Sequence, residues 1–144
     1  DRLMRKLILA ASLIFYPIVC SAEDAEKPAF SCVETSLIPA VTGERNGVLM
    51  NNFMLVEEGA LMAPSVKQAK LSFAVVNRSG NTAYASADVV VYGETKEPLF
   101  SLTASPMFGM LKPGGNETVN SWTYVNEGTV SKARKFCIRV AIAG

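Results

Sequence analysis

The side chains best suited to chemistry in this chain are three cysteines, six methionines and thirteen acidic residues. The chain contains no histidine, which excludes a Ser-His-Asp triad, a Cys-His pair and an imidazole zinc site. Two carboxylates could still form a glycosidase-like pair, but Glu57-Glu58 is most simply a solvated turn. We therefore expect a protein that is not an enzyme, with no catalytic residue, no cofactor and no metal.

Two of the cysteines, Cys32 and Cys137, are predicted to form a disulfide. The third, Cys20, lies in the apolar N-terminal segment described below, and an even count in an exported protein implies pairing. Closing a loop of about 100 residues would stabilise the fold by about 4.7 kcal/mol in the chain-entropy model. The alternative is a pair of buried free thiols.

The methionines suggest a second kind of chemistry. Met50 and Met54 are four residues apart, and Met107 and Met110 are three apart. Thioether sulfur is a soft ligand that suits Cu(I), so a periplasmic carrier of a small ligand or of copper, using these Met-rich loops, is an alternative function. Methionine also fills gaps in ordinary cores.

The stretch SPMFGMLKPGG, residues 105–115, is a candidate partner-binding loop. Methionine and phenylalanine are enriched at protein interfaces, and Met107, Phe108 and Met110 would be its contact residues. The alternative is that the segment folds back and caps the core, because apolar side chains are normally buried. Exposure of Phe108 distinguishes the two.

The N-terminal residues read as a secretory signal. Residues 1–3 precede Met4, a basic pair follows, residues 7–19 are apolar, and small residues end at Ala22. An apolar run of about 13 residues is shorter than the roughly 20 that a membrane-spanning helix needs. We expect cleavage after Ala22 rather than an uncleaved anchor or a lipid on Cys20, and no stable membrane span afterwards.

The expected organisation is therefore a signal peptide over residues 1–22, a flexible tail over 23–29 and one domain over 30–144. Residues 1–22 hold three basic residues and one acidic residue, so the 14 basic and 13 acidic residues of the chain leave 11 and 12 in the mature part. Without a basic patch, nucleic acid is not an expected partner. We expect a periplasmic or extracellular location and a partner that is another envelope or secreted protein.

Hydrophobic alternation with a period of two covers most of the mature chain and predicts strands. The segments 69–75, 85–91, 100–104 and 136–142 each place apolar residues on one face. Residues 47–56 could be a hairpin turning at Asn51-Asn52 or one longer strand, and residues 57–68 could contain a short helical turn. About seven short strands with frequent turns predict an all-β fold, a single antiparallel β-sandwich with one disulfide; a small barrel is the alternative.

The last predicted strand also places the disulfide. Cys137 and Arg139 share the face opposite to Phe136 and Ile138, and an unpaired buried arginine would be costly. The disulfide should therefore lie on an outer face or edge, and not between the sheets as in antibody domains.

Three short patterns resemble bacterial extracytoplasmic immunoglobulin- or fibronectin-III-like modules of the FxLYD type. They are Val75–Asn77 before a polar turn, Val89–Tyr92 at a strand end and Leu111–Gly114 in a later turn, within Leu71–Val125. Gly93 stands where the FxLYD pattern has an acidic residue. The resemblance implies an exported accessory domain and transfers no catalytic residue.

The turn VVNRSGNTAY, residues 75–84, contains the sequon Asn77-Arg78-Ser79, and a second sequon begins at Asn116. Asn77, Gly80 and Asn81 tolerate the backbone angles of a turn, which explains them without glycosylation. We expect a non-catalytic protein that binds another protein or forms part of an envelope assembly. If residues 77–81 and the 105–115 loop lie at one end of the sandwich, they could form a single surface.

Overall fold

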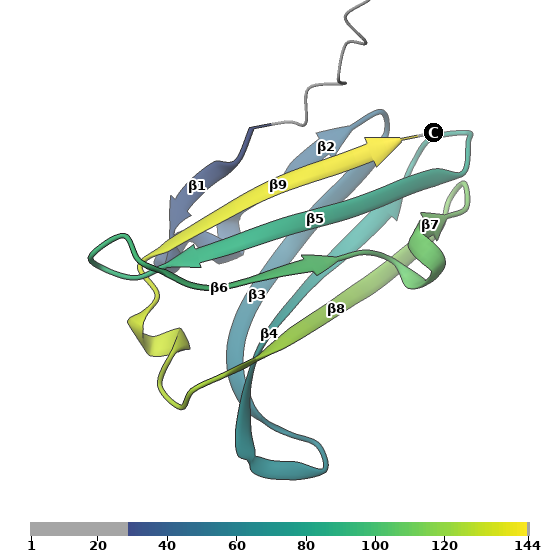
Figure 1. The fold of residues 1–144 in the computed structure, drawn as a ribbon. Helices are drawn as coiled ribbons and strands as arrows, with labels where there is room; N and C mark the ends of the chain where they lie inside the picture. Colours follow the sequence, from purple (N-terminus) through teal and green to yellow (C-terminus); the bar gives the residue numbers. More distant parts are fainter. Residues whose placement is uncertain (1–28, 144) are drawn as a thin grey trace, which may run out of the picture.

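A computed structural model describes residues 29–143, which form two antiparallel β-sheets packed face to face (Figure 1). One sheet has the order β1-β9-β5-β6, with β7 paired to β5, and the other has the order β2-β3-β4-β8. The predicted β-sandwich is confirmed. The strands are β1 (Ser31–Glu34), β2 (Gly43–Arg45), β3 (Val48–Ala60), β4 (Ala63–Asn77), β5 (Ala83–Tyr92), β6 (Pro98–Ala104), β7 (Met110–Leu111), β8 (Asn116–Val125) and β9 (Lys135–Ala143).

Three short 3-10 helices connect the strands: η1 (Thr35–Ala40), η2 (Met107–Gly109) and η3 (Val130–Lys132). The described residues hold nine strands rather than about seven, because β2 and β7 have only three and two residues and show no alternation. No helix within residues 29–143 is long and apolar enough to cross a membrane. The predicted signal peptide and residues 23–28 of the predicted tail lie outside the described residues.

The core is built from the inner faces of both sheets, as the alternation predicts. Ala69, Leu71, Phe73 and Val75 of β4 are all fully buried. At the centre, the ring of Phe53 stacks on that of Phe73 with centroids 4.7 Å apart. The burial of closely packed apolar side chains is the main favourable contribution to the stability of such a fold.

Strand β3 is one long strand and not a hairpin. Its register with β4 shifts between Asn51 and Met54, and Asn52 takes a left-handed φ of 57°. This bulge inserts an extra residue, so the side chains that follow it switch faces. The expected turn at Asn51-Asn52 is therefore a bulge within a continuous strand.

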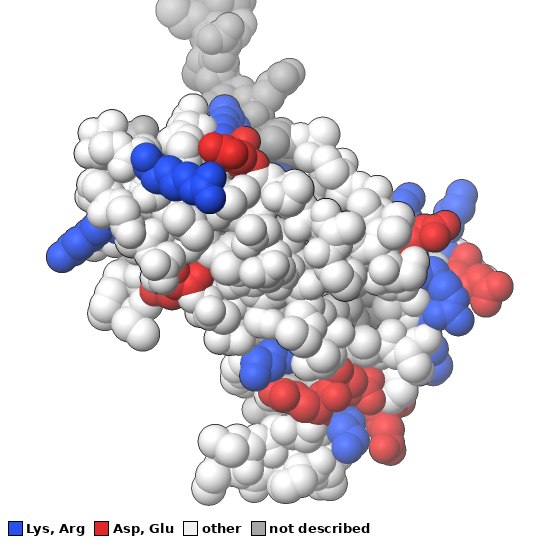
Figure 2. Space-filling view, turned by 180° about the vertical axis from the view of Figure 1, so that it is seen from behind, with Lys and Arg blue, Asp and Glu red and all other residues white. Residues whose placement is uncertain are grey.

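Strands β3 and β4 extend past the sandwich as a two-stranded hairpin with Leu61 and Met62 at its tip (Figure 1). The helical turn considered for residues 57–68 is wrong, because these residues pair across the hairpin. Both tip side chains are almost fully exposed. Figure 2, seen from behind, shows the tip as an uncharged knob beyond a band of mixed charges, while the sheet face above it is mostly uncharged.

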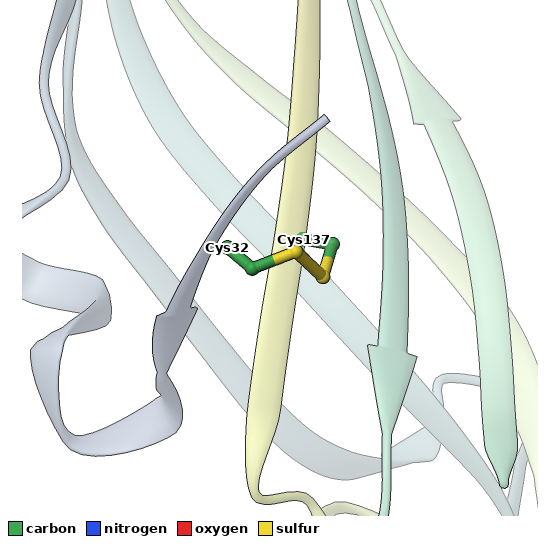
Figure 3. Close-up of a disulfide and its surroundings, with 2 residues drawn as sticks. All are labelled: Cys32 and Cys137. Carbon is green, nitrogen blue, oxygen red and sulfur yellow. A yellow bond between two sulfur atoms is a disulfide. The ribbon is translucent and has the colours of Figure 1, made fainter. Parts of the chain in front are cut away.

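The disulfide joins Cys32 of β1 to Cys137 of β9, which are direct partners in the ladder with Cα atoms 4.0 Å apart (Figure 3). Cys32 is exposed and Cys137 is buried, but neither belongs to the cluster of side chains packed between the sheets. On the same face, Nη2 of Arg139 lies 2.9 Å from Oδ2 of Asp88, and the guanidinium of Arg139 packs over the ring of Phe30. The predicted pairing and its position on the outer face are confirmed.

Candidate functional site

The loops at one end of the sandwich converge on Asn77, the last residue of β4. Its backbone N–H donates to the carbonyl of Gly115, at 2.9 Å, and its carbonyl accepts from the N–H of Gly114, at 2.8 Å. The next residue, Arg78, donates to the carbonyl of Gly47 at 2.7 Å. The β2–β3, β4–β5 and β7–β8 connections are therefore joined through one short segment.

The side chain of Asn77 completes this network. Its Nδ2 group donates to the carbonyls of Asn81, at 2.8 Å, and Leu111, at 2.9 Å. Its Oδ1 atom accepts from the backbone N–H and the hydroxyl of Ser79, at 3.0 and 2.6 Å. Asn77 is fully buried, and these four bonds use the whole capacity of its amide.

The turn after Asn77 forms for a reason that differs from the expected one. Asn77, Gly80 and Asn81 do not adopt positive φ. The bond from the Ser79 N–H to the Asn77 side chain, two residues earlier, is instead an Asx-turn. In the two loops bonded to this segment, the residues with left-handed φ are Asn46 and Gly47 of the β2–β3 turn and Gly114 of the β7–β8 connection.

The predicted partner-binding loop lies at this same end. Strand β7 pairs with the start of β5, where Tyr84 is opposite Met110. Phe108 is 87% exposed, Met107 70%, Tyr84 54% and Met110 41%. We call these four residues the loop surface. The segment does not fold these side chains back onto the core; Leu111 and Pro106 are the residues that turn inward and are buried.

The backbone of the loop surface makes two hydrogen bonds that hold it against its surroundings. The N–H of Met107 donates to Oε2 of Glu117 on β8, and the N–H of Gly109 donates to the carbonyl of Pro106, both at 2.8 Å. Phe108 has a left-handed backbone, with φ 61° and ψ 12°. Such a conformation costs about 1–2 kcal/mol for a residue with a side chain, and the alternation of the sequence gives no sign of it.

The structure separates Met50 from Met54, the two methionines that are four residues apart. Residues four apart share a face in a regular strand, but the bulge at Asn52 lies between them. Met50 is buried in the core and Met54 is exposed on the outer face. Within residues 29–143, no group of three or more His, Cys, Asp or Glu side chains is arranged to hold a metal ion.

The two adjacent carboxylates are not a solvated turn, because both lie in β3. Glu57 accepts from the N–H groups of Gly128, at 2.8 Å, and Val130, at 3.0 Å. These backbone donors hold the pKa of Glu57 below its ordinary value. Glu58, on the other face of the strand, accepts from Gln68 and pairs with Lys70. Both carboxylates therefore have structural partners.

The chain matches no protein-family model, and a search of curated proteins finds no similar sequence. The two-sheet architecture agrees with the sandwich that the FxLYD-type resemblance implies. Membership of that particular family stays a prediction.

Proposed function

We propose that this protein is an exported, non-catalytic β-sandwich that binds another envelope or secreted protein through the loop surface. The observation that carries the proposal is the exposure of Phe108, 87%, in a loop whose backbone is hydrogen-bonded at Met107 and Gly109. A large apolar side chain gains free energy when a partner covers it. Burying such a side chain contributes about 1.5–3 kcal/mol.

The hydrogen bonds of the loop backbone also favour binding, because they lower the entropy cost of ordering the loop in a complex. Association normally costs the ordering of flexible loops and side chains. Here the N–H of Met107 is already bonded to Glu117, and the loop is linked through Leu111 to the buried amide of Asn77. A partner would therefore meet Phe108, Met107, Met110 and Tyr84 in place, and aromatic anchors of this kind often dominate interfaces.

Two further features support export and an accessory role. The disulfide Cys32–Cys137 is typical of proteins from oxidising compartments, and residues 4–22 have the pattern of a secretory signal. The copper-carrier alternative has less support, because Met50 and Met54 lie on opposite faces of β3.

Phe108→Gly is the sharpest test, because glycine tolerates the left-handed backbone and removes the whole side chain. We expect its stability to match or slightly exceed that of the unmodified protein, while a partner captured from envelope extract is lost. The matched control is Trp122→Ala, which removes another exposed aromatic side chain, from β8.

The captured protein should then be purified and its affinity measured by calorimetry. Loss of affinity of about tenfold or more in Phe108→Gly, with Trp122→Ala unchanged, would support the proposal. Equal affinity of Phe108→Gly and the unmodified protein would contradict it.

A further inference from the structure

A second surface lies on the side of the sandwich where β1 and β9 face β2 and β3. It is a groove with a volume of about 480 Å³, within the roughly 300–1,000 Å³ typical of small-molecule sites. Its apolar lining comes from both sheets. The lining includes Val33, Val41, Met50, Phe53, Val140 and Ile142.

The groove exists because this side of the sandwich stays open. On the opposite side, β6 and β8 approach each other, and the hydroxyl of Ser121 donates to the carbonyl of Thr103 at 2.8 Å. On the groove side, the edge strands β1 and β2 have four and three residues, and η1 connects them. Within residues 29–143, no strand pairs with the outer edge of either.

The floor and the lips of the groove differ in exposure. Met50 and Phe53 are buried and close the floor, whereas Val33, Val140 and Ile142 are only partly buried. These half-covered side chains would release more surface water when an apolar molecule lies against them. The groove is therefore suited to an apolar chain or ring system.

Two charged residues of β2, Glu44 and Arg45, line the groove, and their side chains lie on opposite faces of the strand. Residues directly opposite in a ladder point to the same side of the sheet, and Arg45 pairs with Val48, a core residue. Glu44 also lines the groove, but it pairs with Leu49, so its side chain lies on the outer face of the sheet. Arg45 is exposed, and among the described residues it makes no ion pair.

We infer that this groove binds an amphiphilic anion, with its apolar part between the sheets and its acidic headgroup at the guanidinium of Arg45. The lining supplies the apolar contact, and the unpaired guanidinium supplies a charge-assisted bond to a carboxylate. The inference does not depend on the loop surface. A charge that points inward on an edge strand also discourages two copies from pairing their strands, so the experiment must separate these roles.

The probes are dodecanoate and its neutral analogue dodecanol, both below their aggregation limits, titrated into the full chain by calorimetry. We expect Arg45→Gln to weaken dodecanoate binding about tenfold or more, the size of a lost charge-assisted bond, and to leave dodecanol unchanged. The matched control Glu44→Gln removes the neighbouring charge, whose side chain lies on the other face of β2, and should bind dodecanoate at least as tightly as the unmodified protein. Val140→Phe, which fills the groove, should weaken both ligands.

Two results would overturn the inference. One is no binding of dodecanoate to the unmodified protein. The other is an Arg45→Gln variant that binds dodecanoate as tightly as the unmodified protein. If that variant also self-associates in sedimentation, the role of Arg45 is to prevent the β2 edges of two copies from pairing. The Arg45 and Glu44 variants decide the question even if Val140→Phe fails to fold. Phe108→Gly should keep its dodecanoate affinity, which separates this groove from the loop surface.

Discussion

Replacing Asn77 with alanine should destabilise the protein more than any other exchange of a polar side chain at this end of the sandwich. Asn77 is the only polar residue among the buried side chains of the described chain. Alanine would remove four side-chain hydrogen bonds: the Leu111 carbonyl would lose the Asn77 amide, and the Asn81 carbonyl would keep only the hydroxyl of Ser79 as a side-chain donor. The Leu111 bond is fully buried, so water cannot readily replace it.

The magnitude follows from these bonds. A buried carbonyl left without a donor costs about 1–3 kcal/mol, and each less buried bond contributes about 0.5–1.5 kcal/mol net. With one buried carbonyl and three less buried bonds, the expected loss for Asn77→Ala is about 2.5–7.5 kcal/mol, a large fraction of the roughly 5–15 kcal/mol that stabilises a typical domain. Asn77→Asp keeps the volume and the acceptor for Ser79 but loses both donors, so it should cost at least as much at neutral pH.

Urea unfolding followed by circular dichroism measures these losses as changes in the free energy of unfolding. Asn81→Ala is the matched control, since its backbone carbonyl is the atom that accepts from Asn77, and it should change stability by less than about 0.5 kcal/mol. A loss below about 1 kcal/mol for Asn77→Ala, or an equal loss for Asn81→Ala, would refute the role of the Asn77 amide in holding the loops.

Three further predictions concern other parts of the molecule. Reducing the Cys32–Cys137 bond, which spans 105 residues, should lower the free energy of unfolding by up to about 4.7 kcal/mol, measured by urea unfolding with and without reductant. Because the pKa of Glu57 is lowered in the folded state, its contribution is present at neutral pH and is lost as the pH falls below 4.5; Glu57→Gln should have a flatter stability profile in acid. In a glycosylating host, glycopeptide mass spectrometry of the folded, secreted protein should find glycan at Asn116, which is exposed, and none at Asn77, whose Nδ2 is buried and donates two bonds.

The strands could be predicted because alternation in the sequence directly reflects which side chains are buried. Leu71, Phe73 and Val75 were expected inward from their spacing, and all three are buried. The disulfide followed from the count of cysteines, and its outer position followed from the face that Cys137 shares with Arg139.

The errors arose where one residue breaks the local pattern. For residues 47–56, the longer strand is correct and the hairpin is wrong, because Asn51-Asn52 belongs to a bulge, which also separates Met50 from Met54. The hairpin ending in Leu61 and Met62 has apolar residues at its tip, so it lacks the polar turn signal on which hairpin prediction depends. The groove at Arg45 could not be anticipated, because β2 is too short for its pairing partner to be inferred.

The sequence by itself determined that apolar and polar residues alternate along the chain and that two cysteines were available to pair. It also determined that Met107, Phe108 and Met110 lie in one loop. These are local properties, set by spacing along the chain. Only the tertiary structure decided that Phe108 is exposed, that Tyr84 joins it through the β5–β7 pairing, and that one buried amide holds the surrounding loops together. Exposure and convergence depend on which distant segments pack against each other, and no spacing within a single segment specifies that.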